Sequence, residues 1–92
     1  MLVVRRLIWD TWNVAHIARH QVTPDEVEAV CHGQFVCRQS YQERQLLIGP
    51  TGAGRMLAVV IAPKGEDTYY VVTARPADRG ERRQYEHEKG SE

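Results

Sequence analysis

Residues 45–75 read QLLIGPTGAGRMLAVVIAPKGEDTYYVVTAR, and this stretch decides the fold. Three apolar runs within it, residues 45–48, 55–62 and 68–73, are rich in the β-branched and aromatic residues that favour strands. Turns that contain glycine separate the runs. We therefore predict three strands of an antiparallel meander.

The first of these turns resembles a phosphate-binding P-loop in its glycine spacing. Arg55 stands where a P-loop needs Lys, and Met56 stands where it needs the Ser or Thr hydroxyl that holds magnesium. A thioether is a weak acceptor, and magnesium prefers hard oxygen ligands. A strand also follows where a P-loop would open a helix. The turn is therefore predicted to be a hairpin loop with glycines at positive φ, and no nucleotide partner is expected.

Five further elements are expected around the meander: a short edge strand within residues 2–9, helices over 10–18 and 24–32, a strand over 34–38 and a helix over 79–87. Together they predict a single α+β domain over residues 1–92, with two N-terminal helices, a four-stranded antiparallel sheet and a C-terminal helix. Residues 88–92 are expected to be a disordered tail.

Two of the helix starts carry capping signals. Thr23 precedes Pro24, which suits the first helical position, and Glu26 completes a capping box. Asp78 and Glu81 have the same spacing before the last helix.

The first helix is predicted to begin after Asp10 and to be amphipathic. Its inward face is expected to carry the apolar residues Val14, Ile17 and Ala18. A neighbouring face is expected to carry a polar stripe of Asn13, His16 and His20. The aromatic residues Trp9, Trp12 and Phe35 are assigned to the core.

Overall charge does not favour a nucleic-acid binder, because twelve basic residues balance twelve acidic ones. A nucleic-acid site would therefore need a local basic patch. Cys31 and Cys37 stand in a chain without a signal peptide or a transmembrane run, so a reduced, cytoplasmic setting without a membrane partner is expected.

Several motifs together resemble the BrnT-type toxins of bacterial type II toxin–antitoxin systems. The matching motifs are WD at 9–10 with Asn13, IARH at 17–20, VTP at 22–24, GAGR at 52–55, TARPA at 73–77 and ERRQY at 81–85. The resemblance implies a fold similar to the RelE superfamily, ribonuclease activity without a metal, and a small inhibitory antitoxin, often of ribbon-helix-helix type. One departure is Gln21, which follows Arg19-His20 where the family has glycine. Glutamine tolerates positive φ poorly, so the turn between the first two helices becomes less forgiving.

RNA cleavage without a metal needs a base for the 2′-hydroxyl, positive donors around the phosphorane and a proton for the leaving oxygen. The residues expected to supply these functions are Arg55, Arg75, Arg82, Arg83, His20 and Tyr85, with Glu81 as a further base. RNA contacts are expected from Arg44, Arg79 and Tyr70. Several of these arginines are expected to converge on one concave face.

Other interpretations stay open. The arginines of the last helix can instead form a solvated face with local ion pairs, and the chain can be a partner-binding or RNA-binding module without catalysis. Five His and Cys side chains could together bind zinc, but a zinc site is not expected because the sequence contains no Cys-x-x-Cys pair. These side chains are His16, His20, Cys31, His32 and Cys37.

Overall fold

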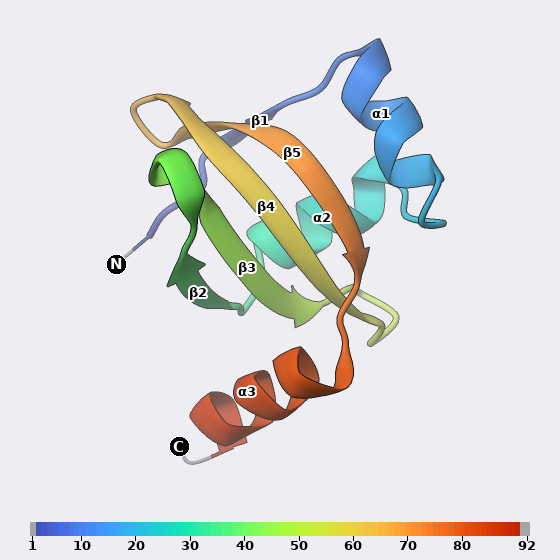
Figure 1. The fold of residues 1–92 in the computed structure, drawn as a ribbon, viewed down its shortest axis with the longest axis vertical. Helices are drawn as coiled ribbons and strands as arrows, with labels where there is room; N and C mark the ends of the chain where they lie inside the picture. The colour runs from blue at the N-terminus through green and yellow to red at the C-terminus, as the bar shows by residue number, and fades with distance from the viewer. Residues whose placement is uncertain (1, 91–92) are drawn as a thin grey trace.

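A curved five-stranded sheet forms the centre of the structure, a computed structural model that describes residues 2–90 (Figure 1). The strands are β1 (Arg6–Ile8), β2 (Val36–Gln39), β3 (Gln45–Pro50), β4 (Met56–Gly65) and β5 (Thr68–Pro76). The helices are α1 (Thr11–Ala18), α2 (Pro24–Cys31) and α3 (Arg79–Gly90), with a short 3-10 turn, η1, at Tyr41–Glu43. The strand order is β1-β5-β4-β3-β2, and the α+β class is as predicted.

The predicted meander is confirmed in β3, β4 and β5, which pair antiparallel. The loop between β3 and β4 is a hairpin loop in which Gly54 has φ 90°. Strand β4 begins directly after Arg55, so no helix follows the glycines. The interpretation of this segment as a hairpin rather than a P-loop is therefore confirmed.

Strand β1 adds a fifth, parallel member to the predicted four-stranded antiparallel sheet. It pairs with β5 at the edge, with Leu7 opposite Tyr69. Strand β4 occupies one edge of β5, which leaves the other edge open for a strand from the N-terminal segment. The buried Leu7 side chain joins the main core and holds β1 in this place.

Both predicted capping boxes at the later helices form. At α2, Thr23 and Glu26 cap each other's backbone N–H groups. At α3, the Glu81 carboxylate accepts from the Asp78 N–H at 2.9 Å, and Asp78 accepts from the Glu81 N–H at 2.8 Å. Helix α3 continues past the predicted end to Gly90, so part of the expected tail is helical, and residues 91–92 lie outside the described range.

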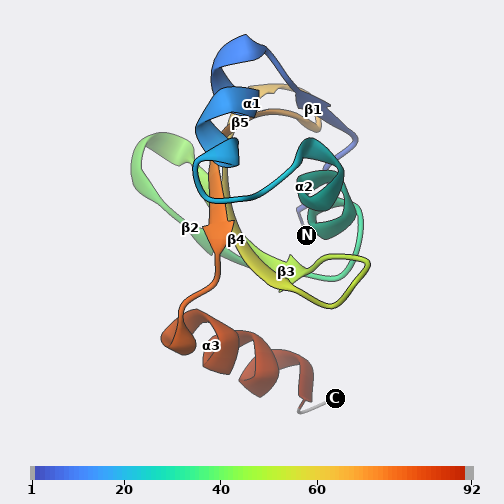
Figure 2. The same ribbon diagram turned by 90° about the vertical axis from the view of Figure 1, so that its right-hand side faces the viewer.

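The two faces of the sheet carry separate apolar clusters. The larger one, the helix-side core, packs α1 and α2 against one face, as Figure 2 shows for α2. It includes Ile17, Val27, Leu57 and Ala74. The smaller one, the α3-side cluster, contains Val36, Ile48 and Ala77, with Leu46, Met56 and Tyr85 packed against it.

Asn13 is fully buried and connects α1 to the sheet. Its side-chain Nδ2 donates to the Ile8 carbonyl at 3.0 Å and to the Val71 carbonyl at 3.1 Å. Its Oδ1 accepts from the Asp10 N–H at 2.9 Å. The predicted polar stripe is therefore wrong at Asn13, because a side-chain amide whose donors and acceptor all have hydrogen-bond partners can be buried at little cost.

Burial of Asn13 turns other α1 residues outward. Ile17 is buried as predicted, whereas Val14 and Ala18 are exposed. Trp12 is 59 % exposed, so its assignment to the core is wrong. The two other aromatic residues of that assignment, Trp9 and Phe35, are partly buried and pack against the helix-side core.

Replacing Asn13 tests its role in the fold. We expect Asn13→Ala to lower the free energy of unfolding by about 2–4 kcal/mol, because the buried Val71 carbonyl and the partly buried Ile8 carbonyl lose this donor. Val14→Ala on the same helix is the control and should change it by less than about 0.5 kcal/mol. Urea unfolding followed by circular dichroism measures both, and equal effects of the two substitutions would contradict the assignment.

Candidate functional site at the start of α3

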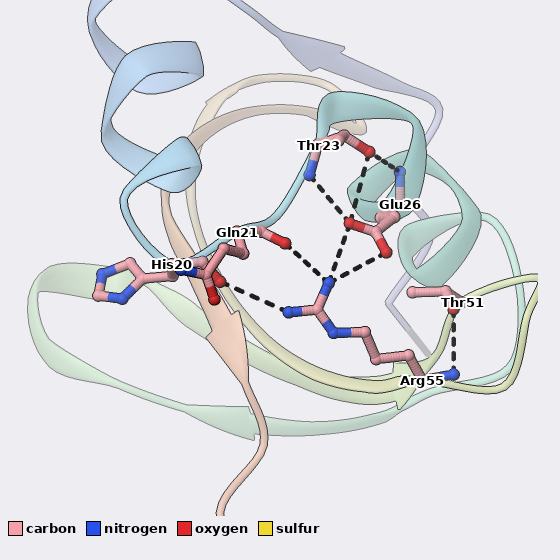
Figure 3. A network of polar contacts seen from close by, with 6 residues as sticks. All are labelled: His20, Gln21, Thr23, Glu26, Thr51 and Arg55. Atoms are coloured by element: carbon pink, nitrogen blue, oxygen red, sulfur yellow. Dashed lines mark hydrogen bonds and ion pairs between the residues drawn. The ribbon is translucent and has the colours of Figure 1, made fainter.

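Arg55 connects the β3–β4 hairpin to the corner between α1 and α2 (Figure 3). Its Nη1 donates to the Gln21 carbonyl at 2.8 Å and to the Glu26 carboxylate at 3.1 and 3.2 Å, and its Nη2 donates to the His20 carbonyl at 3.4 Å. The His20 ring points away from the Arg55 guanidinium (Figure 3). Most donors of Arg55 are thus bound within the protein, and the residue holds this corner together.

Glu26 serves both the helix cap and Arg55. The Thr23 backbone N–H is the main cause that lowers the pKa of the Glu26 carboxyl, and Arg55 lowers it further. Glu26 therefore stays ionised at neutral pH and neutralises Arg55.

Gln21 takes the left-handed conformation that glycine would favour, with φ 59°. The less forgiving turn expected from the sequence is thus present. Its carbonyl is the acceptor for Arg55.

Arg75 and Glu81 form a two-pronged ion pair where β5 leads into α3. Nη1 and Nη2 of Arg75 each lie 2.8 Å from a carboxylate oxygen of Glu81. Arg75 is the main cause that lowers the pKa of the Glu81 carboxyl, and the Asp78 N–H adds to it. A carboxylate with a lowered pKa and two bound oxygens is a weak proton acceptor, so Glu81 is unsuited to the role of base.

Three further arginines lie in the first two turns of α3, on which Glu81 also lies. Arg82 donates from Nη1 to the Ala77 carbonyl at 3.1 Å. Arg79 and Arg83 are exposed, and their guanidinium groups have no partner within residues 2–90. Arg83 lines a surface hollow of about 550 Å³, and the other lining residues are Asp78, Gly80, Glu81, Gln84 and His87. We define Arg75, Arg79, Arg82 and Arg83 as the α3 arginine cluster.

The remaining predicted residues lie apart from this cluster. Leu57 and Ala74 face the helix-side core, so strand alternation places Arg55 on that face and Arg75 on the opposite one. Arg44 precedes β3 at the end of the sheet far from Pro50 and Met56. The expected convergence of arginines on one face is therefore wrong for Arg55 and Arg44, and for the α3 arginine cluster it stays a prediction.

Two tyrosines are bound to other parts of the fold. The Tyr70 hydroxyl donates to Asp10 at 3.0 Å, and loss of solvent followed by this carboxylate raises the pKa of Tyr70. The Tyr85 ring packs against the α3-side cluster. Neither arrangement brings a tyrosine hydroxyl to Arg75.

Cysteine chemistry and metal binding find no support in the geometry. Burial raises the pKa of the Cys31 thiol to about 12, so it carries no thiolate at neutral pH. The Cys37 thiol donates to Gln45 at 3.0 Å, and burial raises its pKa as well. No group of three or more His, Cys, Asp or Glu side chains within the described range could hold a metal ion.

Sequence reasoning missed two features near these residues. Trp12 stacks on His16 on the outer face of α1, with ring centroids 4.7 Å apart. The four-residue spacing of the two rings is visible in the sequence, but the apolar character of tryptophan predicts a core position instead. His87 lies one helical turn from Arg83, a spacing that also follows from the sequence.

Comparison with known proteins identifies the fold. No protein-family model matches the sequence, and no curated protein matches it significantly. Among solved structures, the crystal structure of the Brucella abortus ribonuclease toxin BrnT is similar, with a TM-score of 0.66 and 23 % sequence identity. The match covers 80 % of this chain and 97 % of that one. The chain has a BrnT-type fold. None of the helices within residues 2–90 has the length and apolar character needed to span a membrane.

In this BrnT-type fold, substitution of Gln21 tests how much backbone strain the corner between α1 and α2 carries. We expect Gln21→Gly to raise the free energy of unfolding by up to about 1 kcal/mol, because glycine relieves the left-handed strain but loses more chain entropy. Gln21→Ala keeps the strain and should stay within about 0.5 kcal/mol of the wild type. Urea titration decides, and a destabilised glycine variant would show that the turn is not strained.

The Arg75–Glu81 pair should give stability a pH dependence. The lowered pKa of Glu81 means that its contribution is present above the unfolded pKa of about 4.3 and is lost as pH falls through the folded value. We expect Glu81→Gln to cost about 0.5–1 kcal/mol at pH 7, after allowance for the partly exposed Arg75, and progressively less as pH is lowered from 7 through the folded pKa of Glu81. Thermal unfolding across this range measures it, with Glu86→Gln on the exposed side of α3 as the control. A cost that does not change with pH would contradict the ion pair.

Proposed function

We propose that this chain is an endoribonuclease toxin of BrnT type, which cleaves RNA without a metal ion in the bacterial cytoplasm. The observation that carries the proposal is the α3 arginine cluster, in a fold similar to that of a protein that is itself a ribonuclease toxin. Because the chain as a whole is neutral, such a local group of guanidiniums is the feature that an RNA phosphate would recognise.

The proposed reaction uses the ribose itself as the nucleophile. The 2′-oxygen attacks the adjacent phosphorus, its proton goes to a base, and the bond from phosphorus to the 5′-oxygen breaks as that oxygen takes up a proton. The products are a 2′,3′-cyclic phosphate and a 5′-hydroxyl. Negative charge grows on the non-bridging oxygens, where fixed guanidinium donors stabilise it most.

The roles of the individual side chains are part of the proposal. Arg75, Arg82 and Arg83 are proposed to hold the phosphorane, and Arg55 to position the corner that presents His20. The exposed His20 ring is the proposed proton carrier, and Tyr85 is proposed to hold α3 in place through its packing. Contacts farther along the RNA are assigned to the outlying residues Arg44, Arg79 and Tyr70.

We propose that a small antitoxin, of ribbon-helix-helix type, inhibits the toxin by covering the α3 arginine cluster. Acidic side chains of such a partner would take the places that phosphates take in RNA. Expression of this chain alone should then stop bacterial growth. Co-expression of the gene next to its own, which we expect to encode the antitoxin, should restore growth.

A second function is favoured by the ion pairs. Arg55 and Arg75 each face a carboxylate of the same chain, Glu26 and Glu81, which weakens their field toward a phosphate. A binding module without catalysis would fit this neutralisation, and it would bind RNA or its partner without cleaving RNA.

Cleavage of a labelled RNA in the presence of EDTA separates the two functions. We expect the wild type to cut the RNA, and Arg75→Ala and Arg82→Ala each to slow cleavage by about 100-fold or more, as for loss of a transition-state donor. Arg5→Ala is the control, because this guanidinium is 75 % exposed and lies 3.8 Å from Asp67 on the hairpin between β4 and β5. Melting curves check that each variant folds. RNA binding without cleavage would favour the second function, and loss of activity in EDTA would contradict the metal-free reaction.

A further inference from the structure

Three aromatic rings follow one another along the exposed side of α1 and just beyond its end. Trp12 and His16 stack with ring centroids 4.7 Å apart and planes 9° apart. His20 meets His16 edge-on at 6.0 Å. Trp12 remains 59 % exposed, so much of its indole surface is open to solvent.

A surface hollow of about 290 Å³ lies beside this row. It is lined by Thr11, Trp12, Ala15, His16 and Arg19, and none of these five residues is acidic. The Arg19 guanidinium has no hydrogen bond or ion pair to any residue of the described range, 2–90. The hollow thus combines an aromatic surface with a cation that is not neutralised.

The packing of the fold does not require Trp12. The sheet-facing side of α1 is occupied by Asn13 and Ile17, both fully buried. Trp12 stacks on His16 on the opposite side and leaves much of its indole in water, where the ring can stack on a base. An open indole ring next to a free guanidinium is the combination that binds bases and phosphates of a single strand.

We propose that Trp12, His16 and Arg19 form a subsite for an unpaired base of single-stranded RNA; the proposal rests on the proposed function. The base stacks on the open face of Trp12, which His16 supports from the other face. Arg19 contacts a phosphate next to that base. Because stacking uses the ring faces that all bases share, the subsite is tolerant of sequence.

The position of the row connects this subsite to the proposed cleavage site. His20 ends the row, and its carbonyl accepts from Arg55, which directly precedes β4. The start of β4 lies beside the end of β5, since the Ala77 N–H donates to the Met56 carbonyl at 3.0 Å. A strand held at Trp12 would therefore run past His20 toward the end of the sheet from which α3 begins. An apolar protein partner would not use the cation, so RNA is the favoured occupant.

Binding of a 2′-O-methyl RNA oligonucleotide of mixed sequence tests the subsite, because this probe has no free 2′-hydroxyl and cannot be cleaved. We expect Trp12→Ala to weaken binding roughly 5- to 100-fold, the range found for loss of one stacked base, and Trp12→Phe to stay within about 3-fold of the wild type. Arg19→Ala should lower the salt dependence of log K by about 0.7, as for loss of one phosphate contact to a single strand. Val14→Ala, on the same helix and outside the hollow, is the control.

A spectroscopic signal comes from Trp12 itself. In a Trp9→Phe background Trp12 is the remaining tryptophan, and the oligonucleotide should quench its fluorescence. Trp9→Phe removes the hydrogen bond that Trp9 donates to Glu28 at 2.8 Å. Circular dichroism is therefore needed to check that the Trp9→Phe background folds. Quenching by RNA supports the subsite, and unchanged emission at saturating RNA contradicts it.

The outcomes separate this inference from the proposed function. Equal affinity of wild type and Trp12→Ala overturns the subsite, even if the wild type cleaves RNA. Binding that depends on Trp12, without any cleavage, supports the subsite and overturns the toxin activity. Absence of RNA binding overturns the subsite. Loss of co-purification with the neighbouring gene product in Trp12→Ala, with RNA affinity unchanged, would assign the row to protein docking instead and also overturn it.

Discussion

The buried amide of Asn13 is the interaction on which the N-terminal half of the structure depends. It donates to the Ile8 carbonyl at the end of β1 and to the Val71 carbonyl in β5, and its Oδ1 accepts from the Asp10 N–H at the start of α1. One side chain thus fixes both the place of α1 and its rotation about its own axis. That rotation puts Ile17 into the core and turns Trp12 and His16 outward, so a structural amide determines which rings are available to a ligand.

At the starts of α2 and α3, as in α1, the residue that closes the capping box also contacts a distant part of the fold. In both α2 and α3, the third residue of the helix is a glutamate that closes a capping box and also binds an arginine of the sheet region. Glu26 binds Arg55, which directly precedes β4, and Glu81 binds Arg75 in β5. A local helix signal therefore becomes a tertiary contact, because the carboxylate held by the cap through one oxygen offers both of its oxygens to the arginine. The two pairs fasten the beginning of β4 to α2 and the end of β5 to α3.

The sequence predicted what depends on neighbours along the chain, and it failed where distant residues meet. The meander and the Thr23–Glu26 cap follow from strand composition and capping spacing, and both are present. Burial of Asn13 could not be predicted, because its acceptors belong to β1 and β5 and hydrophobic periodicity treats asparagine as surface. The parallel place of β1 likewise depends on which sheet edge stays open. Arg55 and Arg75 lie on opposite faces of the sheet because the face of each strand residue depends on the strand register. A bulge near Val60 and Ile61 shifts the register between β4 and β5 by one residue, and the sequence does not reveal this shift.

An ion-paired arginine can turn to a phosphate at low cost only if the protein groups that it releases keep other hydrogen-bond partners. When Arg75 turns toward RNA, Glu81 keeps its bond from the Asp78 N–H, so the carboxylate is not orphaned. When Arg55 turns away, Glu26 keeps its cap, but the Gln21 carbonyl loses the donor that braces a left-handed turn. Release of Arg55 therefore costs more than release of Arg75. Of the two pairs, the one at α3 is therefore the one that a phosphate would open at the lower cost, and this difference favours the α3 side of the sheet for the proposed chemistry.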